Sequence, residues 1–253
     1  MKNVRIGKEK KMRLDKFLAE AGIGSRTEVK QLLKKKQVLV NGKVEISPKT
    51  QIDEKADQIS CRGQMLSYEK YVYYMLNKPK GVISATEDNH HKTVLDLLDK
   101  TAWDKEVFPV GRLDIDTHGL LLLTNNGKLA HAMLSPKKHV DKTYRAKVAG
   151  LMTTADVAAF ANGIDLKDFT CQPAQLVILE TNEAERTSVV EITIKEGKFH
   201  QVKRMVQAYG KKVTDLQRLS MGPLHLDKQL ALGEWRRLTD DELACLEEFD
   251  VEL

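Results

Sequence analysis

The sequence has few cysteines, no long apolar run and none of the common cofactor motifs. Its three cysteines, Cys61, Cys171 and Cys245, are far apart and form no CxxC or Cys/His pair, so neither a zinc site nor a disulfide framework is predicted. No apolar run approaches the roughly 20 residues that a membrane span requires, and the basic segment 1–11 lacks the apolar core of a secretion signal. P-loop, dinucleotide-binding and GxSxG sequences are absent as well. These absences predict a cytoplasmic protein with reduced thiols.

Positive charge is concentrated at the N-terminal end of the 253 residues. Residues 1–62 contain 16 Lys and Arg against 8 Asp and Glu, a net charge of +8, whereas the remaining residues contain 25 against 28, a net charge of −3. A basic segment in front of a near-neutral body is typical of a polyanion-binding module attached to a separate functional domain. The alternative is a solvated charged face, which is the preferred interpretation for Lys34–Lys36 taken alone.

The first 62 residues predict two short helices followed by a hairpin. Residues 13–21 place apolar side chains at helical spacing. Ser25 and Glu28 have the spacing of a capping box at the start of a second helix. Asn41-Gly42, between apolar residues on both sides, predicts a type I′ hairpin turn.

The patterns at 12–18, 25–26 and 38–42 resemble the S4 domain, a small RNA-binding module, which would occupy residues 12–62. In that family a basic helix face contacts folded RNA, and lysines and arginines spaced by four residues share one side of a helix. The resemblance therefore implies contacts that position phosphates without reading sequence. The residues that it implies for RNA binding are Arg13, Lys16, Arg26, Lys30 and Lys34.

Residues 63–70 are polar and predict a linker, followed by a second domain at 71–253. Strand-like and helix-like segments follow one another there without a regular βαβ order, which predicts an α+β fold with a mixed, largely antiparallel sheet. Three tyrosines lie within residues 71–74, where they could stack on bases. A place in the core is the more common role for such a run.

The segment 108–124 carries the strongest chemical signal. Asp114 and Asp116 lie on a short polar turn just before the apolar run Leu120–Leu123, which predicts a fully buried strand. A carboxylate beside Arg112 at the entry to a buried strand is a candidate reaction centre. Aspartate is also common at turns and in structural ion pairs, and spacing alone favours that structural role.

Three ordered motifs favour a catalytic role instead. Gly111–Leu120 resembles the central motif of the pseudouridine synthases, and Lys142–Tyr144 and Glu196–Met205 resemble its two companion motifs. With the S4-like module in front, the chain resembles the branch that modifies ribosomal RNA, and most closely its RsuA type, which acts on small-subunit (16S) RNA.

The resemblance also implies roles for single residues and partners. Asp114 would be catalytic, Tyr144 would pack on the target base, Lys203 would pair with the aspartate, and Arg112 would enter the space left by the flipped nucleotide. The uridine N1–C1′ bond would break and C5 would join C1′, without a metal or another cofactor. The implied partner is ribosomal RNA in a pre-ribosomal particle, with no membrane, and the protein is expected to be a monomer.

Three alternatives remain open at this point. The first is a large-subunit (23S) enzyme of the same branch, which shares all three motifs. The second is a non-catalytic ribosome assembly factor that uses only the S4-like module. The third, and the least favoured, is a metal-dependent nuclease that uses Asp114 and Asp116.

Overall fold

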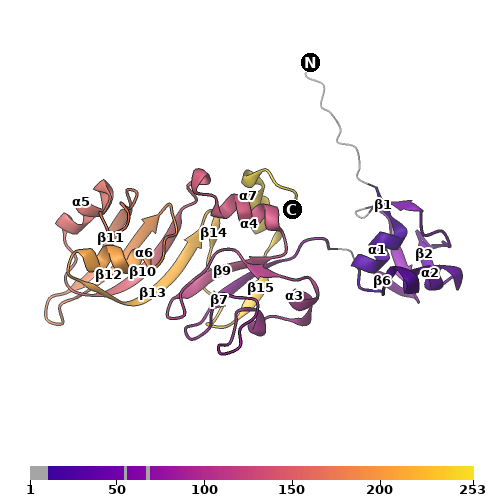
Figure 1. The fold of residues 1–253 in the computed structure, drawn as a ribbon, viewed down its shortest axis with the longest axis horizontal. Helices are drawn as coiled ribbons and strands as arrows, with labels where there is room; N and C mark the ends of the chain where they lie inside the picture. The colour runs from indigo at the N-terminus through magenta and orange to yellow at the C-terminus, as the bar shows by residue number, and fades with distance from the viewer. Residues whose placement is uncertain (1–10, 54–55, 67–68) are drawn as a thin grey trace, which may run out of the picture. The chain divides into compact units, whose positions relative to one another are not determined.

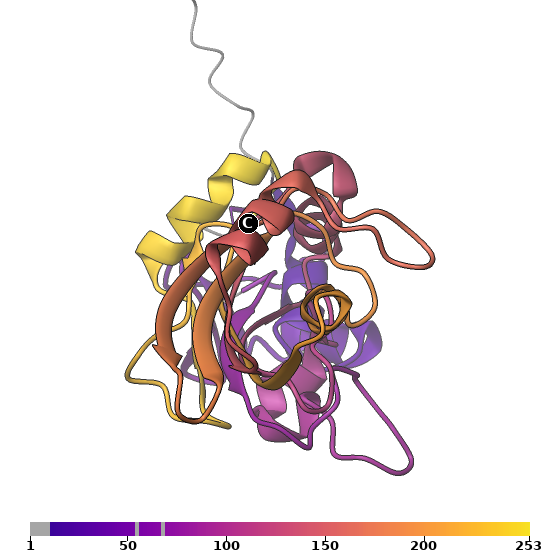
Figure 2. The same ribbon diagram turned by 90° about the vertical axis from the view of Figure 1, so that its left-hand side faces the viewer.

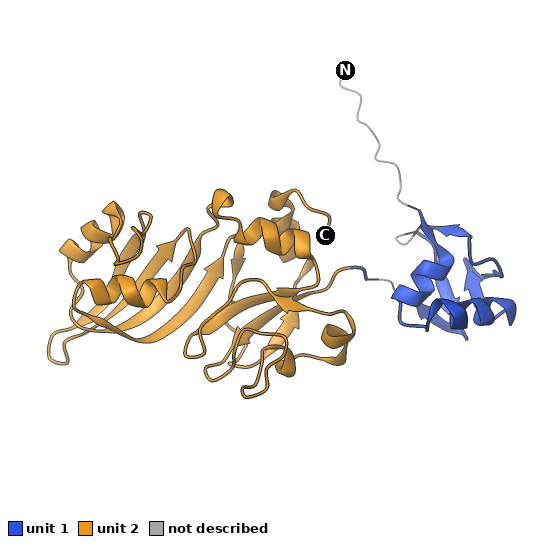
Figure 3. Ribbon diagram, in the orientation of Figure 1, with its two compact units in different colours: residues 1–70 blue, residues 71–253 orange. Residues whose placement is uncertain are grey.

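Two compact units divide the chain between residues 70 and 71 (Figure 3). The computed structural model describes residues 11–53, 56–66 and 69–253. Almost all of the basic N-terminal segment 1–11 therefore lies outside the described residues. Figure 1 labels the helices and strands of both units.

Unit 1 contains two helices packed on short strands. Its elements are β1 Met12–Arg13, α1 Leu14–Glu20, α2 Arg26–Lys34, β2 Val38–Val40, β3 Lys43–Val44, β4 Gln51–Ile52, β5 Ile59–Cys61 and β6 Gln64–Leu66. Leu14, Phe17 and Leu33 belong to its core cluster and are at most 2% exposed. The Ser25 hydroxyl accepts from the backbone N–H of Glu28, whose carboxylate accepts from the backbone N–H of Ser25. The predicted capping box is confirmed.

The predicted hairpin is confirmed as well. β2 pairs with β3 in the four-stranded sheet β3-β2-β5-β6. Asn41 and Gly42 connect the two strands with φ of 51° and 76°. Both residues of a type I′ turn have positive φ, which asparagine and glycine adopt at little cost.

The prediction of a linker at residues 63–70 is wrong for the first part of that segment. Gln64–Leu66 is not a linker but β6, which pairs with β5 around a tight turn at Arg62 and Gly63. Arg62 has a φ of 52° there and Gly63 a φ of 79°. Arginine rarely occupies the left-handed region, so the sequence gives a weak turn signal at this position although the two strands pair.

A nine-stranded sheet is the centre of unit 2, in the order β11-β12-β10-β13-β9-β7-β15, with β14 and β8 beside β13 and β9. Its strands are β7 Tyr73–Lys78, β8 Phe108–Pro109, β9 His118–Thr124, β10 Lys142–Ala149, β11 Gln175–Asn182, β12 Thr187–Ile194, β13 Lys212–Met221, β14 Leu224–His225 and β15 Trp235–Arg237. The helices are η1 Leu95–Leu97, α3 Lys100–Asp104, α4 Gly127–Leu134, η2 Pro136–Lys138, α5 Thr154–Asn162, α6 Gln201–Ala208, α7 Asp240–Leu246 and η3 Glu247–Phe249. The predicted α+β class is confirmed.

β9 and β13 form the one parallel pair among the strands described in this sheet. At this junction Gly119 lies opposite Arg218 with a φ of 104°. A Cβ on Gly119 would lie 2.7 Å from the backbone nitrogen of Arg218 and closer still to its carbonyl oxygen. Only glycine therefore fits where the two strands meet, directly after the turn that carries Asp114.

The sheet has a separate core on each face, because successive side chains of a strand point to opposite sides. On β9, Leu121 and Leu123 pack in the cluster that includes α6, whereas Leu120 and Leu122 pack in the cluster that includes α4 and α7. Figure 2 shows α6 and α7 on opposite sides of the sheet. All four leucines are at most 1% exposed, which confirms the predicted buried strand.

Tyr73 and Tyr74 are also core residues, 5% and 0% exposed, and lie on opposite faces. The interpretation of the tyrosine run as part of the core is therefore correct for both residues.

No helix of the described residues has the length and apolar character needed to cross a membrane.

Candidate active site

Asp114 lies on a tight turn between β8 and β9. The backbone N–H of Thr117 donates to the carbonyl oxygen of Asp114 over 3.0 Å and closes this turn. Gly81, which follows β7, donates its N–H to the carbonyl oxygen of Ile115 over 2.8 Å. The Asp114 side chain is 29% exposed and reaches the hollow beside the sheet. The turn is thus fixed to the end of β7 and presents a partly desolvated carboxylate.

The Lys78 side chain also supports the turn that carries Asp114. The sequence analysis did not predict this role for Lys78. Its side chain is fully buried at the end of β7, and its ammonium donates to the carbonyl oxygens of Pro79, Asp114 and Thr117 over 3.1, 3.1 and 2.9 Å. Burial lowers the pKa of Lys78 to about 8, although the charges of Asp114 and Asp116 oppose this shift. The one signal in the sequence is a lysine at the end of an apolar strand, which by itself does not indicate a buried ammonium.

Ser84 fixes the residue before Asp114. The Leu113 N–H donates to the Ser84 hydroxyl oxygen over 3.0 Å, and that hydroxyl donates back to the Leu113 carbonyl over 2.9 Å. Together, Lys78 at the end of β7 and Gly81 and Ser84 after it therefore support the aspartate turn at three places. Such support limits the backbone movement of a candidate reaction centre.

Lys203 reaches Asp114 from α6. The helix buries Val202 and Met205 against the sheet and leaves Lys203 at its edge, 20% exposed. The Lys203 ammonium donates to Asp114 Oδ2 over 2.8 Å and to Asp116 Oδ1 over 2.6 Å. The pair expected between Asp114 and Lys203 is thus present across 89 positions of sequence, and the structure adds Asp116 to it.

The Lys203 ammonium and the Asp116 carboxylate each shift the pKa of the other. Burial by itself would lower the pKa of Lys203, but its hydrogen bonds to Asp114 and Asp116 outweigh burial and raise that pKa. The hydrogen bond from Lys203 lowers the pKa of Asp116, which is 67% exposed. Lys203 is therefore a cation at neutral pH and favours the ionised form of Asp116.

His200 and Phe199 lie next to this pair, just before α6. His200 Nε2 is 3.5 Å from Asp114 Oδ1, and the residue has a left-handed φ of 49°. Its ring stacks on that of Phe199 with centroids 3.8 Å apart and planes 17° apart. His200 belongs to the Glu196–Met205 motif, but the sequence does not show its contact with Asp114.

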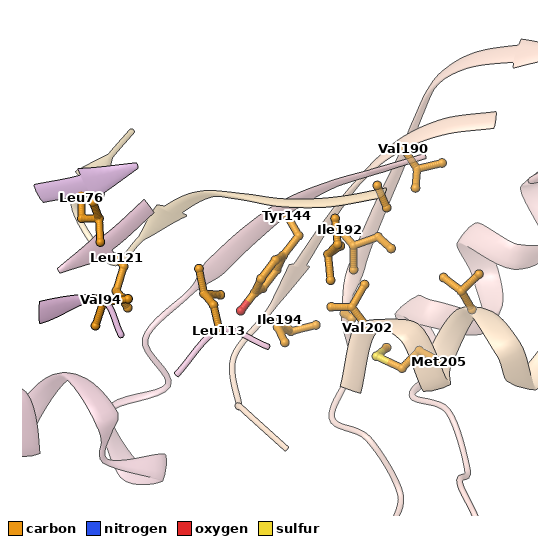
Figure 4. Close-up of a cluster of buried hydrophobic side chains, with 14 of the residues drawn as sticks. Leu76, Val94, Leu113, Leu121, Tyr144, Val190, Ile192, Ile194, Val202 and Met205 are labelled. Atoms are coloured by element: carbon orange, nitrogen blue, oxygen red, sulfur yellow. The ribbon is translucent and has the colours of Figure 1, made fainter. Parts of the chain in front are cut away.

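A shallow hollow brings together the residues expected at the active site. Its lining residues are Arg112, Leu113, Asp114, Thr117, Tyr144, Ile194, Gly197, Lys198, His200, Gln201, Val202, Lys203 and Leu216. Tyr144 extends from β10 into this group and is 8% exposed, with its ring next to Leu113 and Ile194 in Figure 4. Arg112, Asp114, Tyr144 and Lys203 therefore line one site although they come from three separate parts of the chain.

The site is poorly suited to a metal ion. Among the described residues, no group of three or more His, Cys, Asp or Glu side chains is placed to hold one. The position between Asp114 and Asp116, where a nuclease would bind its cation, contains the Lys203 ammonium. This arrangement does not favour the nuclease alternative.

Two more buried cations lie under the site. Lys142 on β10 is 7% exposed and donates to the Val140 carbonyl over 2.8 Å. Arg218 on β13 is 2% exposed and donates from Nε to the Leu120 carbonyl over 2.8 Å. Burial, and then the charge of Arg218, lower the pKa of Lys142 to about 8.

These lysines predict a pH dependence of stability. Lys78 and Lys142 have a pKa of about 8 in the folded chain against 10.5 ordinarily, so the unfolded chain binds more protons between those values. The free energy of unfolding should therefore rise with pH from about 8 to about 10.5, by up to about 3 kcal/mol for each lysine. Urea unfolding of wild type and Lys142→Met across this range measures the effect. The rise should be smaller in the variant, and equal rises would contradict the prediction.

The basic stripe of unit 1, defined as Arg26, Lys30 and Lys34, lies exposed along α2. Arg13 and Lys16 differ from these three. Arg13 donates from Nε and Nη2 to the buried Asp15 carboxylate over 3.0 and 2.7 Å, and Lys16 lies 3.6 Å from Glu20. The stripe is thus the better candidate for RNA phosphates, because Arg13 already neutralises a buried acid.

Comparison with known families agrees with the fold. Residues 72–208 match the model of the RNA pseudouridylate synthase family, and residues 12–59 match that of the S4 domain. The chain belongs to the RNA pseudouridylate synthase family, with an S4 domain in front of the synthase domain. The predicted membership of this family is confirmed.

Relatives align over nearly the whole chain. The uncharacterized RNA pseudouridine synthase YtzG of Bacillus subtilis is 46% identical, covering 94% of this chain and 99% of its own. The ribosomal small subunit pseudouridine synthase A of Vibrio vulnificus is 40% identical (92% and 98%), and the ribosomal large subunit pseudouridine synthase B of Bacillus subtilis is 38% identical (92% and 95%). A crystal structure of a pseudouridylate synthase, 37% identical, superposes with a TM-score of 0.64 over 93% of this chain and 99% of the other.

Proposed function

We propose that this protein isomerises a specific uridine of ribosomal RNA to pseudouridine in the cytoplasm, acting as a monomer on a pre-ribosomal particle. The observation that carries the proposal is the partly exposed Asp114 carboxylate, bonded by Lys203 over 2.8 Å in the same hollow as Tyr144 and Arg112. This set supplies a reactive carboxylate, an aromatic ring for a base and two cations.

The proposed reaction rearranges one nucleotide without adding or removing atoms. The N1–C1′ bond breaks, the uracil rotates, C5 bonds to C1′, and the proton lost from C5 is balanced by one gained at N1. Asp114 is the group that reacts with the nucleotide. The Lys203 ammonium, which donates to Asp114 Oδ2 over 2.8 Å, orients that carboxylate in the hollow.

The target uridine must leave its RNA stack before it can reach this hollow. Tyr144, whose ring lines the hollow, packs on the extruded base. Arg112 is exposed at the rim and occupies the gap left in the RNA, where its guanidinium meets phosphates and base edges. The basic stripe in unit 1 binds phosphates elsewhere on the RNA.

Small-subunit RNA is the first target to test, because the motifs most resemble the RsuA type. Large-subunit RNA is the second candidate, since a relative named for that subunit is 38% identical over 92% of this chain. A non-catalytic assembly factor would need only the S4 domain and would not require a supported aspartate turn.

Tritium release from uridine labelled at C5 tests the function. Purified protein is incubated with transcribed 16S and 23S RNA and with immature subunits, and pseudouridines are mapped in rRNA from a deletion strain. We expect release from one RNA and one missing pseudouridine in the strain. Tight rRNA binding with no release from any of these substrates would overturn the proposal and favour the assembly factor.

The basic stripe gives a separate prediction about RNA binding. The double variant Lys30→Glu with Lys34→Glu should weaken binding and lower the salt slope of log Kd by about 0.7 to 0.9 for each lost phosphate contact. Filter binding at several salt concentrations measures this slope. Lys128→Glu with Lys228→Glu, two exposed lysines of unit 2, is the charge-matched control. An unchanged slope would mean that the stripe is only solvated surface.

A further inference from the structure

Phe199 is an exposed aromatic ring next to the candidate active site. It is 71% exposed, the largest value among the exposed large hydrophobic side chains of the described residues. His200 covers one face of the ring, with centroids 3.8 Å apart and nearly parallel planes. The exposure of Phe199 therefore comes largely from its other face, which is open to a second flat partner.

His200 connects this ring to the reaction centre. Its Nε2 lies 3.5 Å from Asp114 Oδ1, and the ring lines the hollow that contains Asp114 and Tyr144. The left-handed backbone at His200, with a φ of 49°, turns the chain sharply at the start of α6. Phe199 is thus held one stacked ring away from the catalytic carboxylate.

His200 and Lys203 also line a second hollow. Its other lining residues come from the aspartate turn, the end of β10, α6 and the segment that leads into β13: Asp116, Ala149, Arg204, Gln207, Gly210, Lys211, Lys212 and Val213. Its cavity volume is about 720 Å³, against about 80 Å³ for the hollow at Tyr144. The larger one has the size of a ligand site, with room for a nucleotide.

The cations of the second hollow are not equally available. Arg204 is paired with Asp168, Lys211 is 2.6 Å from Asp156, and Lys203 is shared by two carboxylates. Lys212 is exposed, and it has no carboxylate partner among the ion pairs of the described residues. Among the described residues that line this hollow, Lys212 is therefore the cation whose ammonium is available to meet a phosphate.

We infer that Phe199 and the second hollow form a subsite for the nucleotide adjacent to the target uridine. The base of that nucleotide stacks on the open face of Phe199, and its phosphate contacts Lys212. A base whose neighbour has been flipped out loses a stacking partner, and an aromatic ring replaces it for any base identity. The inference rests on the proposed function, since it takes the target uridine to lie in the Asp114 hollow.

The test combines a protein change with a change in the RNA. Two full-length variants are compared, Asp114→Asn alone and Asp114→Asn with Phe199→Ala. Each is titrated with an RNA that contains the mapped uridine and with two further RNAs, one abasic on the 5′ side of that uridine and one abasic on its 3′ side. Phe199→Ala should weaken binding of the intact RNA about tenfold. On the RNA abasic at the stacked position the same change should have almost no effect. Phe199→Trp should bind like the parent.

Controls separate stacking from other effects. Trp103→Ala removes another exposed ring, on α3 and outside both hollows, and should leave binding unchanged. Lys212→Gln should reduce the salt slope by about 0.7, the value for one phosphate of a single strand. Lys128→Gln on α4 is its matched control and should not change the slope.

Each outcome bears on the subsite separately from the reaction. The subsite would be overturned if Phe199→Ala left the affinity for the intact RNA unchanged. It would also be overturned if Phe199→Ala lowered the affinity for both abasic RNAs as much as for the intact RNA. Either result counts even if wild type releases tritium. The same titration is repeated with immature subunits in place of the RNA, and a Phe199→Ala loss seen only there would assign Phe199 to a protein partner and would also overturn the subsite. Absence of tritium release by wild type, with the abasic pattern as expected, would overturn the proposed reaction and leave the nucleotide subsite standing.

Discussion

Asp114→Asn is expected to abolish pseudouridine formation, with kcat/KM lowered on the order of 10⁴-fold or more. Asparagine has the shape of aspartate and keeps an oxygen that can accept from Lys203, which lies 2.8 Å from Asp114 Oδ2. The turn should keep its form, because its backbone bonds to Lys78 and Thr117 do not involve the replaced group. Only the reactive carboxylate is lost.

The measurement is single-turnover tritium release together with RNA affinity. We expect the affinity of Asp114→Asn to stay within about twofold of wild type, since no phosphate contact is removed. Asp116→Asn is the matched control. Asp116 bonds to the same ammonium over 2.6 Å but is 67% exposed, and we expect its loss to change kcat less than about tenfold. Equal losses in the two variants would show that the aspartates act only through Lys203.

Lys78→Met is expected to lower kcat about 100-fold while KM changes little. The substitution leaves the carbonyl oxygens of Pro79, Asp114 and Thr117 without their donor. Buried acceptors that lose a donor destabilise the local conformation, so the turn should relax to reach other donors. A shift of the Asp114 carboxylate of about 1 Å is enough to produce such a loss in rate.

Lys142→Met controls for the removal of a buried cation. Lys142 is also nearly fully buried and also has its pKa lowered to about 8, but its ammonium donates to Val140 and not to the aspartate turn. Steady-state kinetics well below the melting temperature should show a kcat close to wild type for Lys142→Met. If both lysine variants lost kcat equally, or if Lys78→Met lost only thermal stability, the positioning role of Lys78 would be rejected.

Local structure was predictable where neighbouring residues decide it. The capping box at Ser25 and Glu28, the Asn41-Gly42 turn and the buried strand around Leu120–Leu123 all depend on contacts within a few residues. Strand β6 was missed because its turn uses Arg62, whose positive φ is imposed by pairing with β5.

The site was only partly predictable, for a related reason. The sequence by itself determined the α+β class and the two-part organisation, and the resemblance of its motifs predicted Asp114, Tyr144 and Lys203 as site residues. Only the tertiary structure decided that Lys203 also bonds Asp116, that Lys78 holds the aspartate turn and that His200 connects Phe199 to Asp114. These contacts depend on the register of the sheet and on the placement of α6 over it, which bring together residues that are far apart in sequence. Lys78 shows the point most clearly, since a lysine becomes a buried support only where the folded chain supplies three carbonyl oxygens around it.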